Sequence, residues 1–394
     1  MHSSMWTYPW DVQDIGMDEV IAELSATGID TVSLATSYHA GRFLQPRSPK
    51  RKAYFPEDGT IYFEPTPARW ADLRIQPKVA DIVRKGGDVL AALIARRDAG
   101  GPRVSCWTVC LHNTRLGMLH PDAVTRNAFG DPNYYNLCPS HPDVQAYVGA
   151  LVEDVSHRYR PDVIELESPG FMGFAHEYHH EKDAVGLTPE DDFLLSLCFC
   201  PSCTAAATRA GLDVEAARSV VCQWIIDACE REVPQRRLPD FPRCGIEGFR
   251  ASPALYDYLV WRSSPVLALI SELRARTHAD TKVYLIDLKE GWLGGCELSK
   301  VADLCDGVIL CAYAMSPEDV EELFHDGRCT LGPDRYLGAG FRLLYPEFRS
   351  GAELAAQVHS AIRSGAGGLS FYNYGLIPRP RLQWVKAAVG SIAG

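Results

Sequence analysis

The stretch DGVILCAYAMSPEDVEELFHDG (306–327) contains the structural unit that decides the fold. Its first part, GVILCAYAM, is rich in apolar, β-branched and aromatic residues, which is typical of a strand in a buried sheet. Its second part, SPEDVEELFHDG, has the 3.6-residue period of an amphipathic helix. A strand followed at once by a helix is the unit from which parallel sheets are built.

The same βα unit occurs eight times along the chain. Eight such units in 394 residues favour a (β/α)8 TIM barrel, an α/β fold, over an open doubly wound sheet. No Gly-x-Gly-x-x-Gly motif follows the first strand, so a dinucleotide-binding fold loses its best support. The strands are predicted at HSSMWTYPW (2–10), DTVSLATSYH (30–39), PRVSCWTVCLHN (102–113), PDVIELESPG (161–170), TKVYLIDL (281–288), DGVILCAYAM (306–315), RYLGAGFRLL (335–344) and GGLSFYNYG (367–375). The helices that follow them are predicted at 17–28, 77–100, 141–159, 254–277, 298–306, 316–327, 351–366 and 380–390.

One connection is much longer than the others. Residues 171–253 separate the fourth strand from its helix, and this is too long for an ordinary βα loop. The active sites of TIM barrels lie at the face where the strands end, which these loops form. We therefore expect one catalytic domain over residues 1–394, with an inserted lid subdomain at 171–253 above that face.

The composition excludes several classes of protein. Hydrophobic residues make up 46% of the chain and the net charge is −11, which suits a large buried core and argues against binding to nucleic acid. The first residues have no basic start before an apolar run, and no stretch reaches the ~18 apolar residues of a membrane helix. The 13 scattered cysteines fit reduced thiols better than a disulfide framework. We expect a cytoplasmic protein with no membrane partner, and the sequence leaves assembly into a homo-oligomer open.

Two glutamates in the fourth strand are the first candidates for catalysis. In VIELES, Glu165 and Glu167 share one face of the strand, and the apolar residues between them share the other. The apolar face suits the helix layer, so both carboxylates are expected inside the barrel near its mouth. Burial and a neighbouring like charge raise a carboxyl pKa, which keeps a general acid protonated near neutral pH. We predict Glu167 as the catalytic residue and Glu165 as the neighbour that tunes its pKa; the alternative is an ion pair that only orients other groups.

Ordinary glycoside hydrolysis requires a second carboxylate. Asp287, at the end of the fifth predicted strand, is the first choice, and its alternative role is that of a solvated residue at a strand end. Glu290 and Glu347, in the loops after strands five and seven, remain further candidates.

Polar and aromatic side chains recur where the predicted strands end. Aromatic rings beside His, Asn and Arg donors suit a sugar ring, which has apolar faces and a polar edge. Each of them alone is equally compatible with ordinary packing, so their recurrence is the stronger argument. The candidates for substrate binding are Trp6, Tyr8, Tyr38, His39, Arg42, Trp107, His112, Asn113, Tyr313, Arg342, Tyr372 and Asn373.

The segment HEYHHEK (176–182) adds His176, His179 and His180 to the substrate-binding candidates. Its letters HEYHH match the HExxH zinc motif, which requires a helix so that both histidines face one metal ion. Nearby glycines favour a loop, and a zinc protease leaves the paired glutamates without a role. Contact with substrate from a lid loop is the preferred interpretation.

Three cysteines in LSLCFCPSC (195–203) lie within six positions of one another. Cys198, Cys200 and Cys203 need a fourth ligand to form a tetrahedral structural zinc site, and Cys138, after the third strand, is the best candidate. A redox CxxC pair is disfavoured because no thioredoxin-like βαβ context surrounds it. Reduced thiols that only pack the subdomain remain the alternative.

The arrangement resembles the glycoside hydrolase superfamily. A barrel with CPSHPDV after strand three, an inward glutamate in strand four and LCFCPSC in the following insertion is similar to the family 42 β-galactosidases and related hypothetical glycosyl hydrolases. The resemblance covers about residues 100–210 and the order of the barrel elements. It implies that Cys138, Cys198, Cys200 and Cys203 hold zinc and that Glu167 is the acid/base.

Two positions depart from the family 42 pattern. Leu166 stands before Glu167, where family 42 enzymes have Asn-Glu. Strand seven, GAGFRLL, has no carboxylate where they have a nucleophilic glutamate. We therefore expect a glycosidase acting on a small glycoside or oligosaccharide, with a structural zinc ion and no organic cofactor. The alternatives are a metal-dependent sugar isomerase, epimerase or lyase, and a non-catalytic carbohydrate-binding barrel.

Overall fold

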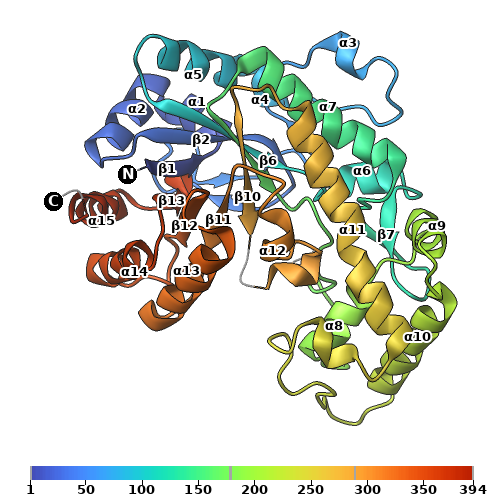
Figure 1. Cartoon of the computed structure of the whole chain (residues 1–394). Coiled ribbons are helices and arrows are strands. Elements are labelled where there is room, and N and C mark those ends of the chain that lie inside the picture. Colours follow the sequence, from blue (N-terminus) through green and yellow to red (C-terminus); the bar gives the residue numbers. More distant parts are fainter. Residues whose placement is uncertain (1, 177–179, 288–289, 393–394) are drawn as a thin grey trace.

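The computed structural model describes residues 2–176, 180–287 and 290–392. Eight parallel strands form a closed barrel, because β1 pairs with β2 on one side and with β13 on the other. This confirms the predicted (β/α)8 TIM barrel, which Figure 1 shows with its strands surrounded by helices. The barrel strands are β1 (His2–Thr7), β2 (Thr31–Tyr38), β6 (Arg103–Val109), β9 (Val163–Glu167), β10 (Lys282–Asp287), β11 (Gly307–Cys311), β12 (Tyr336–Arg342) and β13 (Gly368–Tyr372).

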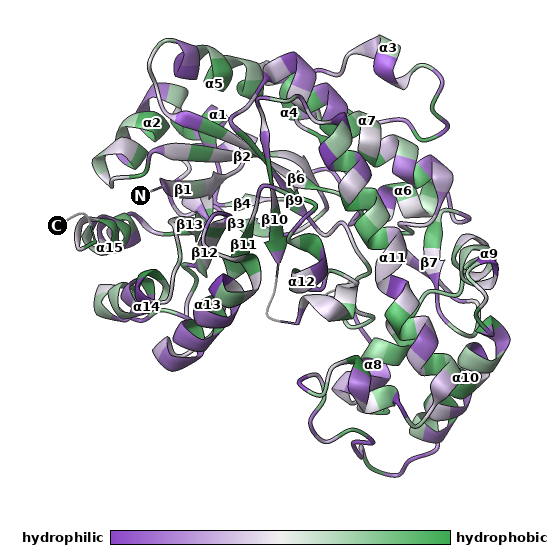
Figure 2. Cartoon of the chain, in the orientation of Figure 1, coloured by the Kyte–Doolittle hydropathy of each residue, from purple (hydrophilic) through white to green (hydrophobic). Residues whose placement is uncertain are grey.

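The helices outside the barrel are amphipathic, as their sequence period predicts. In Figure 2 hydrophobic and hydrophilic residues alternate along the outer helices, for example along α14. Their apolar sides pack on the strands in one large core. The helices around the barrel are α1 (Pro9–Ile15), α2 (Met17–Ala26), α4 (Asp81–Gly86), α5 (Val89–Asp98), α7 (Pro142–Tyr159), α11 (Pro253–Arg276), α12 (Leu298–Val301), α13 (Pro317–Leu331), α14 (Gly351–Arg363) and α15 (Arg379–Gly390).

Several predicted element boundaries differ from the structure, and three of the differences have a clear form. The first strand, predicted over 2–10, ends at Thr7, because the chain turns at Tyr8 into α1 with Pro9 at its first position. The helix predicted over 77–100 is two helices, separated at Gly87, whose φ of 87° cannot continue a right-handed helix. The helix predicted at 298–306 is only the single turn of α12.

The longer loops carry small elements of their own. The loop after β2 contains the hairpin of β3 (Phe43–Leu44) and β4 (Ala53–Tyr54), the short strand β5 (Thr60–Ile61) and helix α3 (Pro67–Trp70). The loop after β6 contains α6 (Thr114–Leu119) and the hairpin of β7 (Val124–Arg126) and β8 (Pro132–Leu137). Both loops lie on the way from a strand end to the next helix and so contribute to the same face of the barrel.

The insertion, residues 171–253, has a small apolar core. Helices α8 (Pro189–Ser196), α9 (Pro201–Arg209) and α10 (Val214–Cys229), with the 3-10 helix η1 (Ile246–Phe249), gather around one end of the long helix α11. Phe193, Val221, Phe249 and Tyr258 are buried in this cluster, which is separate from the cores of the barrel. None of the described helices is both long and apolar enough to cross a membrane.

Candidate active site

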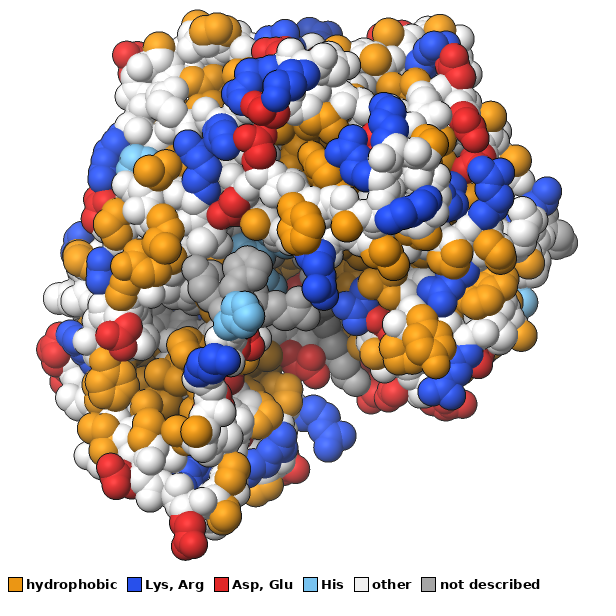
Figure 3. Space-filling model, turned by 180° about the vertical axis from the view of Figure 1, so that it is seen from behind, with side chains coloured by type: hydrophobic (Ala, Val, Ile, Leu, Met, Phe, Trp, Pro, Cys, Tyr) orange, Lys and Arg blue, Asp and Glu red, His pale blue; other side chains and the backbone are white. Residues whose placement is uncertain are grey.

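A cavity of about 710 Å³ opens between the barrel mouth and the insertion. Strand ends supply one side of it, including Glu167, Asp287 and Arg342, and the insertion supplies the other, including Phe193 and Phe241. The face shown in Figure 3 is hollowed between the insertion, at lower left, and the barrel. Its position at the carboxyl ends of the strands is the one that the fold uses for active sites.

Glu165 lies inside the barrel below this cavity. Its side chain is buried and accepts hydrogen bonds from Trp6 Nε1 (2.7 Å), Ser33 Oγ (2.7 Å) and Ser105 Oγ (2.8 Å). Burial raises its pKa, whereas the three donors oppose that rise. Because three side chains surround both carboxylate oxygens and Glu165 does not line the cavity, its geometry suits a supporting group rather than one that touches substrate.

Glu167, two residues later on the same face of β9, lines the cavity. The indole N–H of Trp107 donates a hydrogen bond to its carboxylate. Burial raises the pKa of Glu167 to about 7, the Trp107 donor lowers it, and the charge of Glu165 adds a smaller upward contribution. A carboxyl group with this pKa is substantially protonated at neutral pH and can therefore donate a proton to a bound ligand.

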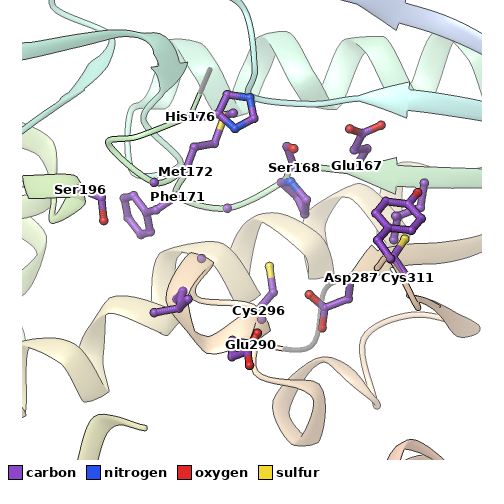
Figure 4. A pocket seen from close by; sticks show the side chains of 18 of the residues that line it. Glu167, Ser168, Phe171, Met172, His176, Ser196, Asp287, Glu290, Cys296 and Cys311 are labelled. Carbon is purple, nitrogen blue, oxygen red and sulfur yellow. The ribbon is translucent and has the colours of Figure 1, made fainter. Parts of the chain in front are cut away.

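Asp287 ends the neighbouring strand β10 and also lines the cavity, as does Glu290. Figure 4 shows Asp287 and Glu290 on the same side as Cys296, with Glu167 and Ser168 on the other side. The backbone of Gly291 packs against the Asp287 carboxylate, because a Cβ at Gly291 would lie 2.5 Å from Asp287 Oδ2. The site thus holds two carboxylates from adjacent strands with a ligand-sized space beside them.

Aromatic side chains with polar edges surround Glu167. The hydroxyl of Tyr8 bonds to those of Tyr38 (2.9 Å) and Tyr372 (2.7 Å), which joins three strand ends. Burial raises the pKa of all three phenols, so they stay neutral and offer O–H groups. Tyr38, Tyr372 and Trp107 line the cavity, whereas Tyr8 supports them from below.

Arg342 and Tyr313 form the far rim of the barrel side. The Arg342 guanidinium lies 4.9 Å from the Tyr313 ring centroid, and its Nε donates to Glu347. Glu347 also accepts the N–H of Ala314 (3.1 Å) and does not line the cavity. These contacts give Glu347 a role in holding Arg342 and make it a poor second carboxylate.

Several predicted binding residues lie away from the cavity. Asn113 caps α6, where its Oδ1 accepts the N–H of Leu116 (2.9 Å), and the Asn373 side chain accepts the N–H of Gly375 (3.0 Å). Arg42 and His180 are exposed and do not line the cavity. His179 lies outside the described residues.

Three histidine rings contact one another beside the mouth of the barrel. His39 and His112 have ring centroids 3.9 Å apart, and His176 meets His112 edge-on at 4.6 Å. Burial lowers the pKa of His39 to about 4 and that of His112 to about 2, so both are neutral near pH 7. Of the three, only His176 lines the cavity.

Of the HExxH letters at residues 176–180, the middle three lie outside the described residues. His180 has a φ of 54°, a left-handed conformation that a continuing right-handed helix does not contain. Among the residues that the structure describes, no histidine belongs to a group whose ligand atoms converge as a metal site requires. The described groups with acid/base chemistry that line the cavity include the carboxylates of Glu167 and Asp287.

Sequence reasoning missed the wall that the insertion contributes. Phe171, Asp192, Phe193 and Phe241 line the cavity, and none was a candidate. The run DDFLLSLCFC gave an apolar signal, but its period does not show which side chain faces a cavity formed with a distant loop. Ser168 was also missed; it lines the cavity with a strained φ of 50° directly after Glu167.

The four predicted cysteines come together in one buried cluster. Cys138 Sγ lies 3.4 Å from Cys200 Sγ, 3.5 Å from Cys203 Sγ and 4.0 Å from Cys198 Sγ, and all four sulfurs fall within 4.8 Å of one another. Tetrahedral zinc with bonds of ~2.3 Å places its sulfurs ~3.8 Å apart. The donor set and spacing therefore fit a metal ion held by four thiolates.

Backbone groups also point at these sulfurs. The N–H of Arg126 donates to Cys198 Sγ and that of Cys203 donates to Cys200 Sγ, both at 3.4 Å. Such donors stabilise negative charge on sulfur, which a metal-bound thiolate carries. Cys138 follows β8, whereas the other three cysteines belong to the insertion, so the cluster joins the loop after β6 to the insertion.

Several solved structures share this fold at low sequence identity. The PgaB (BpsB) glycoside hydrolase domain from Bordetella bronchiseptica matches with a TM-score of 0.56 and 15% identity over 99% of both chains. An endo-1,4-beta-mannanase from Rhizomucor miehei gives 0.52 and 8%, covering 100% of this chain and 94% of its own. The C-terminal domain of a putative chitinase from Desulfitobacterium hafniense DCB-2 gives 0.51 and 7%, over 99% and 98%.

These neighbours are glycoside hydrolases by name, and at such identities the likeness establishes the fold alone. None of the three is named as a family 42 β-galactosidase, so that finer resemblance stays a prediction. No protein-family profile matches the sequence, and no curated protein matches it either.

Proposed function

We propose that the protein is a glycoside hydrolase with Glu167 as its general acid. The observation that carries this proposal is a carboxyl group with a pKa near 7, at the end of a barrel strand, in a cavity of about 710 Å³. The aromatic rings and hydroxyl groups around it suit a neutral sugar. Asp287, on the adjacent strand, supplies the second carboxylate.

The reaction follows from these two groups. Protonated Glu167 donates its proton to the glycosidic oxygen as the C–O bond breaks, and the bonding pair leaves with that oxygen. The Asp287 carboxylate then serves in one of two ways: it attacks the anomeric carbon, or it takes a proton from the water that does so. The configuration of the released sugar distinguishes these two roles.

The four-cysteine cluster is proposed to hold a structural zinc ion. Cys138, Cys198, Cys200 and Cys203 fill all four positions of a tetrahedral site, so the ion supplies cohesion and no open position for substrate. By joining the insertion to the loop after β6, it fixes the wall opposite Glu167. The insertion then acts as a lid whose position depends on the metal.

A panel of aryl glycosides in the presence of a chelator that leaves the cysteine-bound ion in place tests this function. We expect release of the aryl alcohol without added metal, because the two carboxylates perform the chemistry. A metal-dependent isomerase, epimerase or lyase would instead act on free sugars and require Mn²⁺, Mg²⁺ or Zn²⁺. Activity on free sugars and on no glycoside would overturn the proposal.

A further inference from the structure

The insertion side of the cavity differs in chemistry from the barrel side. Phe171 and Met172 follow β9, Phe193 lies on α8, Phe241 and Pro242 lie in the loop after α10, and Leu293 lies in the 3-10 helix η2 (Gly291–Gly294). These six residues are called the apolar wall. Figure 4 shows Phe171 and Met172 well separated from Glu167, with Ser196 beside them.

The rings of the wall pack against one another and against side chains of η2 and α11, outside the insertion. Phe193 and Phe241 have centroids 5.6 Å apart, and both contact Trp292, at 5.1 and 5.8 Å. The buried guanidinium of Arg262 lies 4.4 Å from the Phe171 ring centroid and 5.4 Å from that of Phe193. The three phenylalanine rings of the wall are therefore each packed against neighbouring side chains.

Several backbone groups along this wall are bonded to the protein. Gly294 O accepts the N–H of Phe171 (2.9 Å), and Gly173 O accepts the hydroxyl of Tyr135 (2.6 Å). Leu293 O accepts a hydrogen bond from Arg262. Further bonds of the same kind join Asn136 to Gly170 O (3.4 Å) and to the Met172 N–H (3.0 Å).

Two polar side chains, Ser196 and Asp192, line the cavity beside the apolar wall and are each bonded to backbone of the insertion. Ser196 Oγ donates to Phe193 O (2.6 Å), and the Asp192 carboxylate accepts the N–H of Ala175. A sugar has a hydroxyl on nearly every carbon, and each one buried without a partner costs binding free energy. An aromatic or aliphatic group needs no such partners and gains from burial against these side chains.

We propose that the apolar wall is the subsite for an apolar leaving group, so the substrates are glycosides of aromatic or aliphatic alcohols rather than oligosaccharides. This inference rests on the proposed function, because Glu167 defines where the glycosidic oxygen lies. The cavity volume falls within the range of pockets that enclose drug-sized ligands, so it has room for a sugar beside Glu167 and an apolar group on the wall.

A series of n-alkyl glycosides, from methyl to octyl, measures this subsite. Each methylene buried on the wall should raise kcat/KM about fourfold until the wall is covered. A disaccharide of the same sugar should be a poorer substrate than the butyl glycoside. A flat series, or a preference for the disaccharide, would overturn the inference while leaving glycoside hydrolysis in place.

Two matched phenylalanine variants distinguish the loss of a wall side chain from a general loss of packing in the insertion. Phe241 and Phe249 are both buried in the core of the insertion, and only Phe241 lines the cavity. Phe241→Ala should flatten the chain-length series, whereas Phe249→Ala should lower the melting temperature and keep the slope. Leu293→Ser, on a more exposed part of the wall, should flatten the series with less effect on folding.

Binding measurements keep the two proposals apart if no glycoside is cleaved. In that case the proposed reaction fails, and calorimetry with the same alkyl glycosides still measures the wall. Affinity that rises with chain length and loses this dependence in Leu293→Ser supports the subsite. Affinity independent of chain length, or unchanged in the variant, rejects it.

Discussion

The two sides of the cavity are built by different means. On the barrel side each functional group stands at a strand end, as Glu167 and Asp287 do, and the closed sheet fixes its position. On the insertion side Phe193 and Phe241 are buried in a small separate core. Under the proposed function, the closed sheet positions the reacting groups and the insertion shapes the ligand space. Changes on each side should therefore affect different measurements.

The largest expected effect concerns catalysis and leaves folding nearly unchanged. Glu167→Gln removes the proton donor but keeps the shape of the side chain, so kcat should fall by at least ~10²-fold. The melting temperature should change little. Glu318→Gln, an exposed position on α13, is the matched control and should keep full activity. If Glu167→Gln turns over at the wild-type rate, Glu167 has no part in the mechanism.

A cysteine variant should instead lower the stability of the protein more than its catalysis. Cys200→Ser removes one of the four sulfurs, so the protein should lose about one zinc ion per chain and melt about 5 °C lower or more. Activity on a methyl glycoside should fall less than activity on an octyl glycoside, because only the wall moves. Cys229→Ser, at an exposed cysteine in the same insertion, should change neither the zinc content nor the melting temperature.

Elemental analysis of the wild-type protein accompanies that comparison. Absence of zinc, together with four thiols that react with an alkylating agent in the native protein, would leave these cysteines as packing residues only. Retention of zinc in Cys200→Ser would place the metal elsewhere.

The smallest expected effect is a shift in pH dependence. In the proposed mechanism Glu167 acts in its protonated form, so activity should fall as the pH rises through about 7, the raised pKa of this group. The Trp107 N–H favours the ionised carboxylate, so Trp107→Phe should raise that pKa and move the alkaline limb upward by about one pH unit. Trp70→Phe, which removes an N–H donated to Asp154 outside the cavity, is the control and should leave the limb in place. If the alkaline limb of the pH profile moves equally in both variants, it does not report the titration of Glu167.

The barrel could be predicted from sequence because each βα unit has a local hydrophobic pattern, and this pattern is repeated along the chain. The alternation in VIELES placed Glu165 and Glu167 on one face, and the structure has both on the barrel interior. The sequence also predicted Asn113 and Asn373 near strand ends. Such a position indicates where the backbone of a residue lies, but it does not determine which group the side chain contacts. Both side chains bond to nearby backbone N–H groups, as asparagine commonly does at helix starts and turns.

The insertion was predicted only in outline. The cysteine spacing indicated a cluster because a metal site limits which residues can be neighbours, and the four sulfurs do converge. The faces of Phe193 and Phe241 depend on contacts with Trp292, which lies about a hundred residues from one of them along the chain. No local period carries that information, so the apolar wall emerged only from the structure.

The most direct test of the account compares leaving groups in wild-type protein and Glu167→Gln. A general acid matters most when the departing alcohol is a poor leaving group, because an activated phenol departs without protonation. The account predicts that the variant loses at least ~10²-fold in kcat/KM on an alkyl glycoside and far less on a dinitrophenyl glycoside of the same sugar. Equal losses on both substrates would contradict the assignment of Glu167 as the proton donor.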